Sequence, residues 1–382
     1  MANRRSVILL LCLFLVSFSL VFLLKVKNEM VDFEVNYRAA QRLWQGETLY
    51  RTSDGHYQFK YMPFSAFLYL PISFLPLSSA KALWYGIVLL SSGLVFFLTL
   101  KLLRLGKTKS LIVGLFSFLI MARYFFRELQ LGQINALITF LLLLMVWPFV
   151  QEKGPESRRF TSGIFWGLAT ALKPYAVIFL PYFILRKKGR ALASGVIVLF
   201  LAFLAPAIFY GLQGNFEVLD EWQSSLRAST PSLFSSQDNI SIIGFITKWT
   251  GRQDAALAIY LMAMAGLGLL VLFLFLRKVK VSEPILLECF LLLALIPLIS
   301  PLGWDYTLLS STPAVMLILV HFDKYRSFWK ALLCLNFAII ALSLFDILGR
   351  KLYASFMSWS VITINFLILI GYLAYLRIKG HA

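Results

Sequence analysis

The sequence predicts an all-α polytopic membrane protein with about 10 full transmembrane helices and one short re-entrant helix hairpin. Of its 382 residues, 60% are hydrophobic and only 14% are charged, and the mean hydropathy is +0.80. A soluble core of this length needs far more polar surface to cover it. Apolar runs near the roughly 20 residues that cross a bilayer recur along the chain. We therefore expect one integral membrane domain, residues 1–382.

The full spans are expected where these apolar runs lie between short polar connections. The first run follows Arg4 and Arg5 and lacks a small-residue cleavage site, so we expect it to be an uncleaved span. Basic clusters fall in alternate loops, which the positive-inside rule places in the cytoplasm together with both termini. The expected spans are residues 7–24, 82–103, 110–126, 134–150, 191–211, 255–276, 285–300, 307–321, 328–348 and 356–376.

The apolar run 160–185 is expected to be a broken hairpin. Basic clusters flank it on both sides, at Arg158–Arg159 and at 186–190. A single helix would place one cluster outside the cytoplasm, whereas two half-length helices keep both inside. The turn then falls at Lys173-Pro174. Broken backbone in a membrane is tolerated where it is buried in protein or lines a cavity, so we expect Lys173 to face a polar cavity.

Three regions are then external: 25–81, 212–254 and the short turn 300–306. The first contains an expected interfacial helix over about 32–45. Apolar side chains recur on one of its faces at helical spacing, namely Phe33, Tyr37, Ala40 and Trp44.

Composition excludes several classes of function. The net charge of +18 is distributed in short clusters between apolar runs, so it does not form the basic face of a nucleic-acid-binding protein. The three cysteines lie in apolar runs and the three histidines are scattered, which argues against a disulfide framework or a histidine-rich metal site. The chain has no P-loop, G-x-S-x-G, H-E-x-x-H or D-x-D motif. We expect no cofactor and no metal.

Asp32 is the candidate catalytic residue, because a carboxylate at the start of the first external region needs an explanation. Glu34 is explained by an ion pair with Arg38 four residues later. Two other interpretations of Asp32 remain open. It can cap the N-terminus of the interfacial helix, or form a D-x-E metal site with Glu34.

Polar residues gather at the outer end of the span 110–126. Arg123 and Arg127 share a helix face and suit a phosphate group, or they extend toward lipid headgroups. The residues that follow include several polar side chains that can bind sugar hydroxyls or pack between helices. Those with an expected sugar or acceptor contact are Glu128, Gln133 and Asn135.

Lys173 is the third candidate for the donor phosphate. A lysine at membrane depth is a functional hypothesis by default, although a buried ion pair that supports the hairpin is an alternative. The external loop 25–60 is also rich in Lys and Arg. This suggests an anionic substrate such as a phosphate-bearing lipid, or general binding of headgroups.

Two further external segments carry candidate sugar contacts. Asn239 and Ser241 form a formal N-x-S glycosylation site, which is also a candidate polar binding or packing turn. Trp304, Asp305 and Tyr306 follow Ser300-Pro301 in a tight turn. The rings of Trp304 and Tyr306 can stack on a sugar or belong to an interfacial aromatic belt.

Several of these motifs, taken together and in order, resemble glycosyltransferase family 87. They are Asp32…Tyr37-Arg38-Ala39-Ala40…Gly46…Leu49-Tyr50, Tyr61-Met62-Pro63-Phe64, Gly132-Gln133-Ile134-Asn135, Lys173-Pro174, Asn239-Ile240-Ser241 and Ser300-Pro301…Trp304. The resemblance spans most of the chain. It departs from the family pattern at Met62, in place of a proline, and at Asp305-Tyr306, where some members carry histidine.

The resemblance implies a C-type glycosyltransferase with Asp32 as general base. It also implies a polyprenyl-phosphate-sugar donor, mannose most of all, and a glycolipid or glycan acceptor of the cell envelope. The enzyme is then expected to invert the anomeric centre at the outer face of the cytoplasmic membrane. A transporter or flippase for a lipid-linked or anionic solute is the alternative, since broken membrane helices are typical of transporters. A non-catalytic membrane scaffold is a third.

Overall fold

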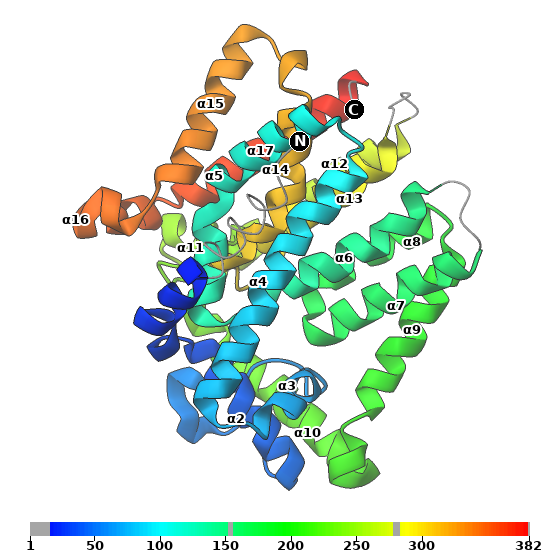
Figure 1. The fold of residues 1–382 in the computed structure, drawn as a ribbon, viewed down its shortest axis with the longest axis vertical. Helices are drawn as coiled ribbons and strands as arrows, with labels where there is room; N and C mark the ends of the chain where they lie inside the picture. Colours follow the sequence, from blue (N-terminus) through cyan, green and yellow to red (C-terminus); the bar gives the residue numbers. More distant parts are fainter. Residues whose placement is uncertain (1–15, 152–155, 278–282, 381–382) are drawn as a thin grey trace.

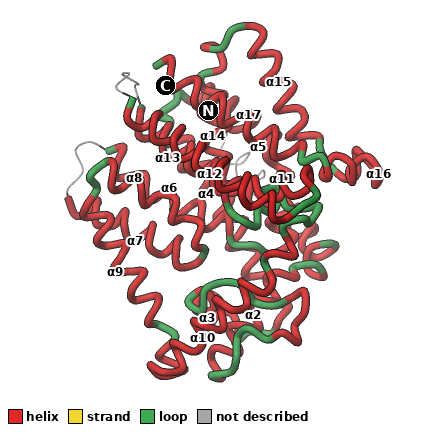
Figure 2. The backbone as a smooth tube through the Cα atoms, turned by 180° about the vertical axis from the view of Figure 1, so that it is seen from behind, coloured by secondary structure: helices red, strands yellow, loops and turns green. Residues whose placement is uncertain are grey.

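The computed structural model describes residues 16–151, 156–277 and 283–380. Within these ranges the secondary structure is helical and contains no strand (Figure 2). The predicted all-α fold is therefore confirmed.

Four of the described helices are long and apolar enough to cross a bilayer by themselves. They are α4 Leu77–Leu102, α5 Lys107–Leu131, α12 Gln253–Leu276, apolar from Ala255, and α17 Val361–Lys379. Shorter apolar helices lie beside them: α6 Asn135–Val150, α13 Pro284–Ile299 and α14 Thr312–Val320, which continues η5 Asp305–Ser311. The protein is therefore an integral membrane protein, and the predicted spans from 82–103 onward each overlap one of its helices. The first predicted span, 7–24, begins outside the described residues.

Two predicted spans cross sharp bends. Helices α9 Gly189–Leu204 and α10 Ala207–Ser229 meet at 89°, and α15 Ser327–Leu342 and α16 Phe345–Ser358 meet at 101°. The first bend lies at Pro206, which has no backbone N–H to continue the helical hydrogen bonds. The predicted spans 191–211 and 328–348 therefore each contain a bend that was not predicted, since hydropathy alone does not register a change of direction.

The chain breaks at Lys173-Pro174, as predicted. Helix α7 Glu156–Leu172 ends there, Lys173 is extended, and η3 Pro174–Phe179 leads into α8 Leu180–Leu185. Trp166 on α7 donates its indole N–H to the carbonyl of Ala176 at 2.9 Å and meets the ring of Phe183 edge-on. These contacts fold the chain back on itself.

The helix predicted over 32–45 is α2 Val31–Gln45. Phe33, Tyr37 and Ala40 are buried, whereas Trp44 is exposed. Met30, not Asp32, is at the N-cap, and no side chain caps this end. The capping interpretation of Asp32 was therefore wrong. The remaining short elements are α3 Ser65–Ser73, α11 Ile242–Thr250, η1 Val26–Asn28, η2 Thr52–Tyr57, η4 Pro231–Leu233 and η6 Phe322–Lys324.

The helices form one bundle with a separate group of elements at one end (Figure 1). Helix α13 packs against α6, α14 and α17, and α5 packs against α14 and α15. Helices α6, α7 and α9 form a flanking layer, in which α7 lies between α6 and α9. Helices α2, α3 and α10 lie together at the end of the bundle away from the C-terminus (Figure 1). The loops between these groups enclose the cavity described next.

Candidate active site

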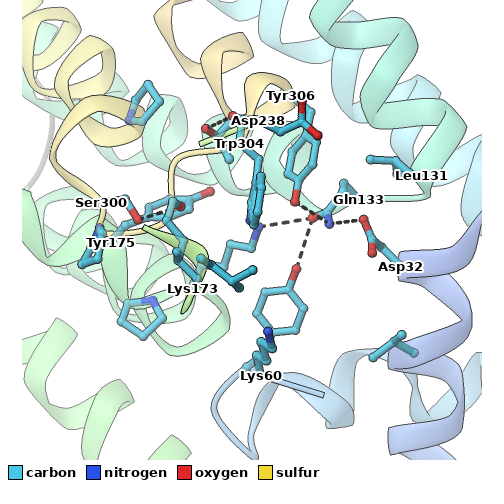
Figure 3. A pocket seen from close by; sticks show the side chains of 18 of the residues that line it. Asp32, Lys60, Leu131, Gln133, Lys173, Tyr175, Asp238, Ser300, Trp304 and Tyr306 are labelled. Atoms are coloured by element: carbon cyan, nitrogen blue, oxygen red, sulfur yellow. Dashed lines mark hydrogen bonds between the residues drawn. The ribbon is translucent and has the colours of Figure 1, made fainter. Parts of the chain in front are cut away.

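A cavity of about 800 Å³ lies where α2, η2, the loop after α5, the break before η3 and the turn 300–306 converge. Polar side chains lie on both sides of it. Asp32 and Gln133 lie on one side, and Tyr175 and Ser300 on the other, with Lys173 between them (Figure 3). Apolar side chains on the wall come mainly from α2, η3 and the end of α13. The cavity can therefore hold a ligand that has both polar and apolar parts.

The loop between α5 and α6 is held against α2 by Gly132. This residue ends α5 with φ +68°, and its carbonyl accepts the indole N–H of Trp84 at 2.8 Å. A Cβ atom at Gly132 would lie 2.7 Å from the Cβ of Phe33 and 2.9 Å from the Cε of Met30. Glycine thus permits both the left-handed turn and the close approach. As a result, the next residue, Gln133, lies beside Asp32.

Asp32 accepts a hydrogen bond at Oδ2 from the amide Nε2 of Gln133, at 2.7 Å. Burial raises the pKa of the Asp32 carboxyl above its ordinary value. The bond from Gln133 opposes this rise, as do the charges of Lys173, Arg127 and His56. A carboxylate with a raised pKa is a stronger base, which is what removal of a proton from a hydroxyl requires.

Lys173 is 8% exposed and lines the cavity. Its ammonium group donates to Oδ1 of Asn135 at 2.8 Å and to Oε1 of Gln133 at 3.2 Å. It also lies 5.1 to 5.9 Å from the ring centroids of three tyrosines, Tyr61, Tyr175 and Tyr306. An ammonium has three donors, so one N–H remains for a ligand.

Asn135 links Lys173 to a buried carboxylate, that of Glu128. Asn135 donates to the Glu128 carboxylate at 2.8 Å, and the backbone N–H of Ala136 donates to its other oxygen at 2.9 Å. Glu128 and Asn135 do not line the cavity. Both alternatives for Lys173 thus have support: it contributes to an internal polar network and also faces the cavity.

Arg123 and Arg127 lie in different surroundings, although four residues separate them. Arg127 lines the cavity and donates to Gln130 at 2.9 Å. Arg123 is turned away from the cavity. It donates to the carbonyl and hydroxyl of Ser343 and to the hydroxyl of Tyr353, and it pairs with Asp305 at 3.3 Å. The structure therefore does not bring Arg123 or Asp305 to the cavity, because the two side chains pair with each other instead.

The turn after α13 is fixed by Asn239. This side chain is fully buried; it donates to the carbonyl of Pro301 at 3.1 Å and accepts the N–H of Gly303 at 3.1 Å. Asn239 therefore packs the turn, rather than binding ligand or carrying a glycan. Trp304 and Tyr306, which the turn positions, both line the cavity.

Several cavity residues were not among the sequence candidates: His56, Lys60, Tyr61, Tyr175 and Asp238. Lys60 belongs to the basic loop, and burial lowers the pKa of its ammonium group. Tyr61 lies in a motif of the resemblance, and the excess of basic residues in 25–60 was the signal for Lys60. His56 and Asp238 gave no distinguishing pattern.

The D-x-E metal interpretation gains no support from the arrangement of the acids. Glu34 pairs with Lys81 at 2.7 Å and with Arg38 at 3.5 Å, as expected for the second pair. Among the described residues, no group of three or more His, Cys, Asp and Glu side chains gathers in a way that could hold a metal ion.

A known mannosyltransferase and a solved membrane-protein structure are similar to this chain. The chain is 27% identical, over 193 residues, to the polyprenol-phosphate-mannose-dependent α-(1-2)-phosphatidylinositol mannoside mannosyltransferase of Mycobacterium tuberculosis. The match covers 49% of this chain and 41% of that protein, so it spans less than half of the relative. The solved structure of ArnT from Cupriavidus metallidurans, bound to undecaprenyl phosphate, is 12% identical with a TM-score of 0.47, over 96% of this chain and 78% of that one.

The profile of glycosyltransferase family 87 matches residues 59–301. This segment contains Lys60, Gln133, Lys173 and Asn239, and it begins after Asp32. The match covers more than half of the sequence, and the protein therefore belongs to glycosyltransferase family 87.

Proposed function

We propose that this protein transfers a hexose, mannose in first place, from a polyprenyl-phosphate donor to a glycolipid or glycan acceptor. The proposal rests on one observation above all: a half-buried carboxylate, Asp32, is held by Gln133 at the wall of a cavity that also contains basic side chains. The related mycobacterial mannosyltransferase depends on polyprenol-phosphate-mannose. A lipid-phosphate sugar has a polar head and an apolar chain, and both polar and apolar side chains line the cavity.

In this mechanism Asp32 is the general base. It takes the proton of an acceptor hydroxyl, whose oxygen attacks the anomeric carbon of the donor sugar. The new C–O bond forms as the bond from that carbon to the phosphate oxygen breaks, and the polyprenyl phosphate leaves with the bonding electrons. Attack from the face opposite the leaving group inverts the anomeric configuration. The proton remains on Asp32 until it is lost to water.

Cationic side chains stabilise the charge that develops on the leaving phosphate. Arg127, Lys60 and the remaining N–H of Lys173 can meet a ligand in the cavity, whereas the donors of Arg123 are already used within the protein. The rings of Trp304 and Tyr306 provide surfaces for a sugar. Two substrates held in one cavity also gain from proximity.

The site is proposed to face the outside of the cytoplasmic membrane, with both termini in the cytoplasm. Arg104, between α4 and α5, pairs with Glu283 before α13 at 3.7 Å, and Arg277 after α12 donates to the carbonyl of Ile378. These basic connections therefore gather near the end of α17, and the positive-inside rule assigns that end to the cytoplasm. Labelling of single cysteines placed at Ser236 and Lys379 in intact cells tests this orientation. Only the cysteine that replaces Ser236 should react.

The reaction is tested with purified protein and synthetic polyprenyl-phosphate-mannose, a panel of cell-envelope lipid acceptors, and EDTA. Asp32→Asn should lower transfer by about 10² to 10⁴-fold while the protein remains folded. The matched control is Asp220→Asn, an exposed acid on α10 outside the cavity, which should transfer at the wild-type rate. Near-normal transfer by Asp32→Asn would remove Asp32 from the role of base. Movement of the lipid across vesicles without covalent transfer would instead establish a flippase.

A further inference from the structure

We propose that Gln133 is a positioning residue: its amide fixes the Asp32 carboxylate and couples it to Lys173, and it is not a ligand of the sugar. The inference rests on the proposed role of Asp32 as base. It also replaces the sugar contact that the sequence suggested for Gln133.

The hydrogen-bonding capacity of the Gln133 amide is fully used inside the protein. Its Nε2 donates to Asp32 at 2.7 Å and to the hydroxyl of Tyr306 at 3.2 Å. Its Oε1 accepts from Tyr61 at 3.2 Å and from Lys173 at 3.2 Å, with Asn135 at 3.4 Å. A primary amide offers two donors and two acceptor lone pairs. With only 3% of the residue exposed, a sugar hydroxyl could bind Gln133 only by displacing one of these partners.

The two ends of the amide meet opposite charges. The oxygen, which carries the negative end of the amide dipole, accepts from the Lys173 ammonium, and the nitrogen end donates to the Asp32 carboxylate. No direct salt bridge between Lys173 and Asp32 occurs in the part of the chain that the structure describes. The amide therefore transmits the favourable interaction between the two charges, and each bond polarises the next. The result is a carboxylate with a fixed orientation.

Gln133 also selects the oxygen that can act as base. It occupies Oδ2 of Asp32, while Oδ1 accepts no hydrogen bond from any described residue. Asp32 lines the cavity, so Oδ1 is the oxygen available to an acceptor hydroxyl. A carboxylate that rotates freely would spend part of its time with neither oxygen correctly directed.

The other groups that face Asp32 come from several elements. The charged or titratable ones are Lys173 before η3, Arg127 on α5, His56 in η2, and the phenols of Tyr61, Tyr69 and Tyr306. Among the influences that favour the ionised carboxylate, the hydrogen bond from Gln133 is the largest. Removal of this bond should therefore raise the pKa of Asp32.

The test uses Gln133→Glu, which keeps the side-chain shape and the acceptor oxygens but, when ionised, cannot donate to the carboxylate of Asp32. The new carboxylate and Asp32 would share a proton, so the acid limb of the pH–rate profile should move up by about one pH unit or more. At its optimum pH, kcat should fall by about 100-fold, and KM for the donor should stay within about threefold. A larger KM for donor or acceptor with unchanged kcat would make Gln133 a substrate ligand and overturn the proposal.

A second measurement needs no substrate. Infrared difference spectra over a pH series follow protonation of the Asp32 carboxyl when each protein is compared with the same protein carrying Asp32→Asn. In Gln133→Glu, and in Gln133→Met as a second variant, this titration should move to higher pH than in the wild type. The matched control, Gln213→Glu on the exposed face of α10, should leave it unchanged. An unshifted titration in both Gln133 variants would overturn the coupling, whereas loss of the proposed reaction in the wild type would overturn only the role of Asp32 as base.

Discussion

Gly132 lies so close to Phe33 that a Cβ atom on the glycine would stand 2.7 Å from the Cβ of Phe33. This contact joins the end of the long membrane helix α5 to the buried face of α2. Phe33 in turn stacks on Trp84, whose indole N–H donates to the Gly132 carbonyl. Phe33 and Gly132 are adjacent in sequence to Asp32 and Gln133, and none of the three packed residues lines the cavity. The candidate active site therefore depends on packing outside the cavity.

Gly132→Ala should therefore damage both stability and transfer. The new methyl group would clash with Phe33 and Met30 and would occupy a left-handed conformation, which together should cost about 1–3 kcal/mol. Thermal unfolding in detergent and the transfer rate measure the two effects. The matched control is Gly266→Ala on α12, where nothing lies within 4 Å of the added Cβ; it should unfold near the wild-type temperature. Equal behaviour of the two variants would contradict the close-packing argument.

Substitution of the lysines that line the cavity should change KM for the donor more than KM for the acceptor. Lys173→Ala and Lys60→Met should each raise donor KM by about tenfold, because each removes a cation that can meet the phosphate. Lys351→Met, which alters an exposed lysine on α16, should leave both KM values unchanged. Initial rates at varied donor and acceptor concentrations give this comparison. If Lys173→Ala weakened the binding of both substrates equally, Lys173 would act mainly through the internal network with Asn135 and Glu128.

Arg123 should behave as a structural residue, despite its sequence position beside Arg127. Arg123→Met breaks a buried pair with Asp305 and leaves Ser343 and Tyr353 without their donor. Loss of one member of a buried pair costs about 3–5 kcal/mol, so the unfolding temperature should fall. In the fraction that remains folded, donor KM should match the wild type. A selective rise in donor KM without loss of stability would instead indicate that Arg123 contacts the donor phosphate.

The transfer rate should fall as pH decreases, because a general base acts only when it is deprotonated. Burial raises the pKa of Asp32, so the acid limb should lie above the ordinary aspartate value of about 3.9. A pH–rate profile of kcat over donor KM measures the limb. Wild-type protein that kept its full rate down to about pH 4 would show that no buried carboxylate acts as base.

Sequence patterns were sufficient for the architecture and for part of the site. Hydropathy located the helices because a bilayer demands long apolar runs, and helical spacing identified the buried face of α2. The unusual position of Asp32 and of Lys173 in otherwise apolar surroundings marked both as candidates. The positions of the bends at Pro206 and Ser343 were not predicted, since an apolar run has the same composition whether the chain is straight or bent.

The site itself is assembled from distant segments. Asp32 and Gln133 are 101 residues apart, and Lys173 lies 40 residues beyond Gln133. Helical periodicity gives the face of a side chain but not its neighbour across a loop. For this reason Arg123 and Arg127 looked alike in the sequence, and only their partners distinguish them. Trp304 and Tyr306 line the cavity while Asp305, between them, faces Arg123.

The sequence by itself determined that this protein is an all-α membrane protein, with a candidate carboxylate at Asp32 and a lysine at a break in a membrane helix. These features follow from local chemistry: the bilayer selects apolar helices and makes isolated charges conspicuous. The tertiary structure decided which polar groups meet in one cavity, which satisfy each other inside the protein, and that a single amide joins Asp32 to Lys173. Those outcomes depend on which helices pack together, because a hydrogen bond requires its partners to lie within about 3 Å of each other.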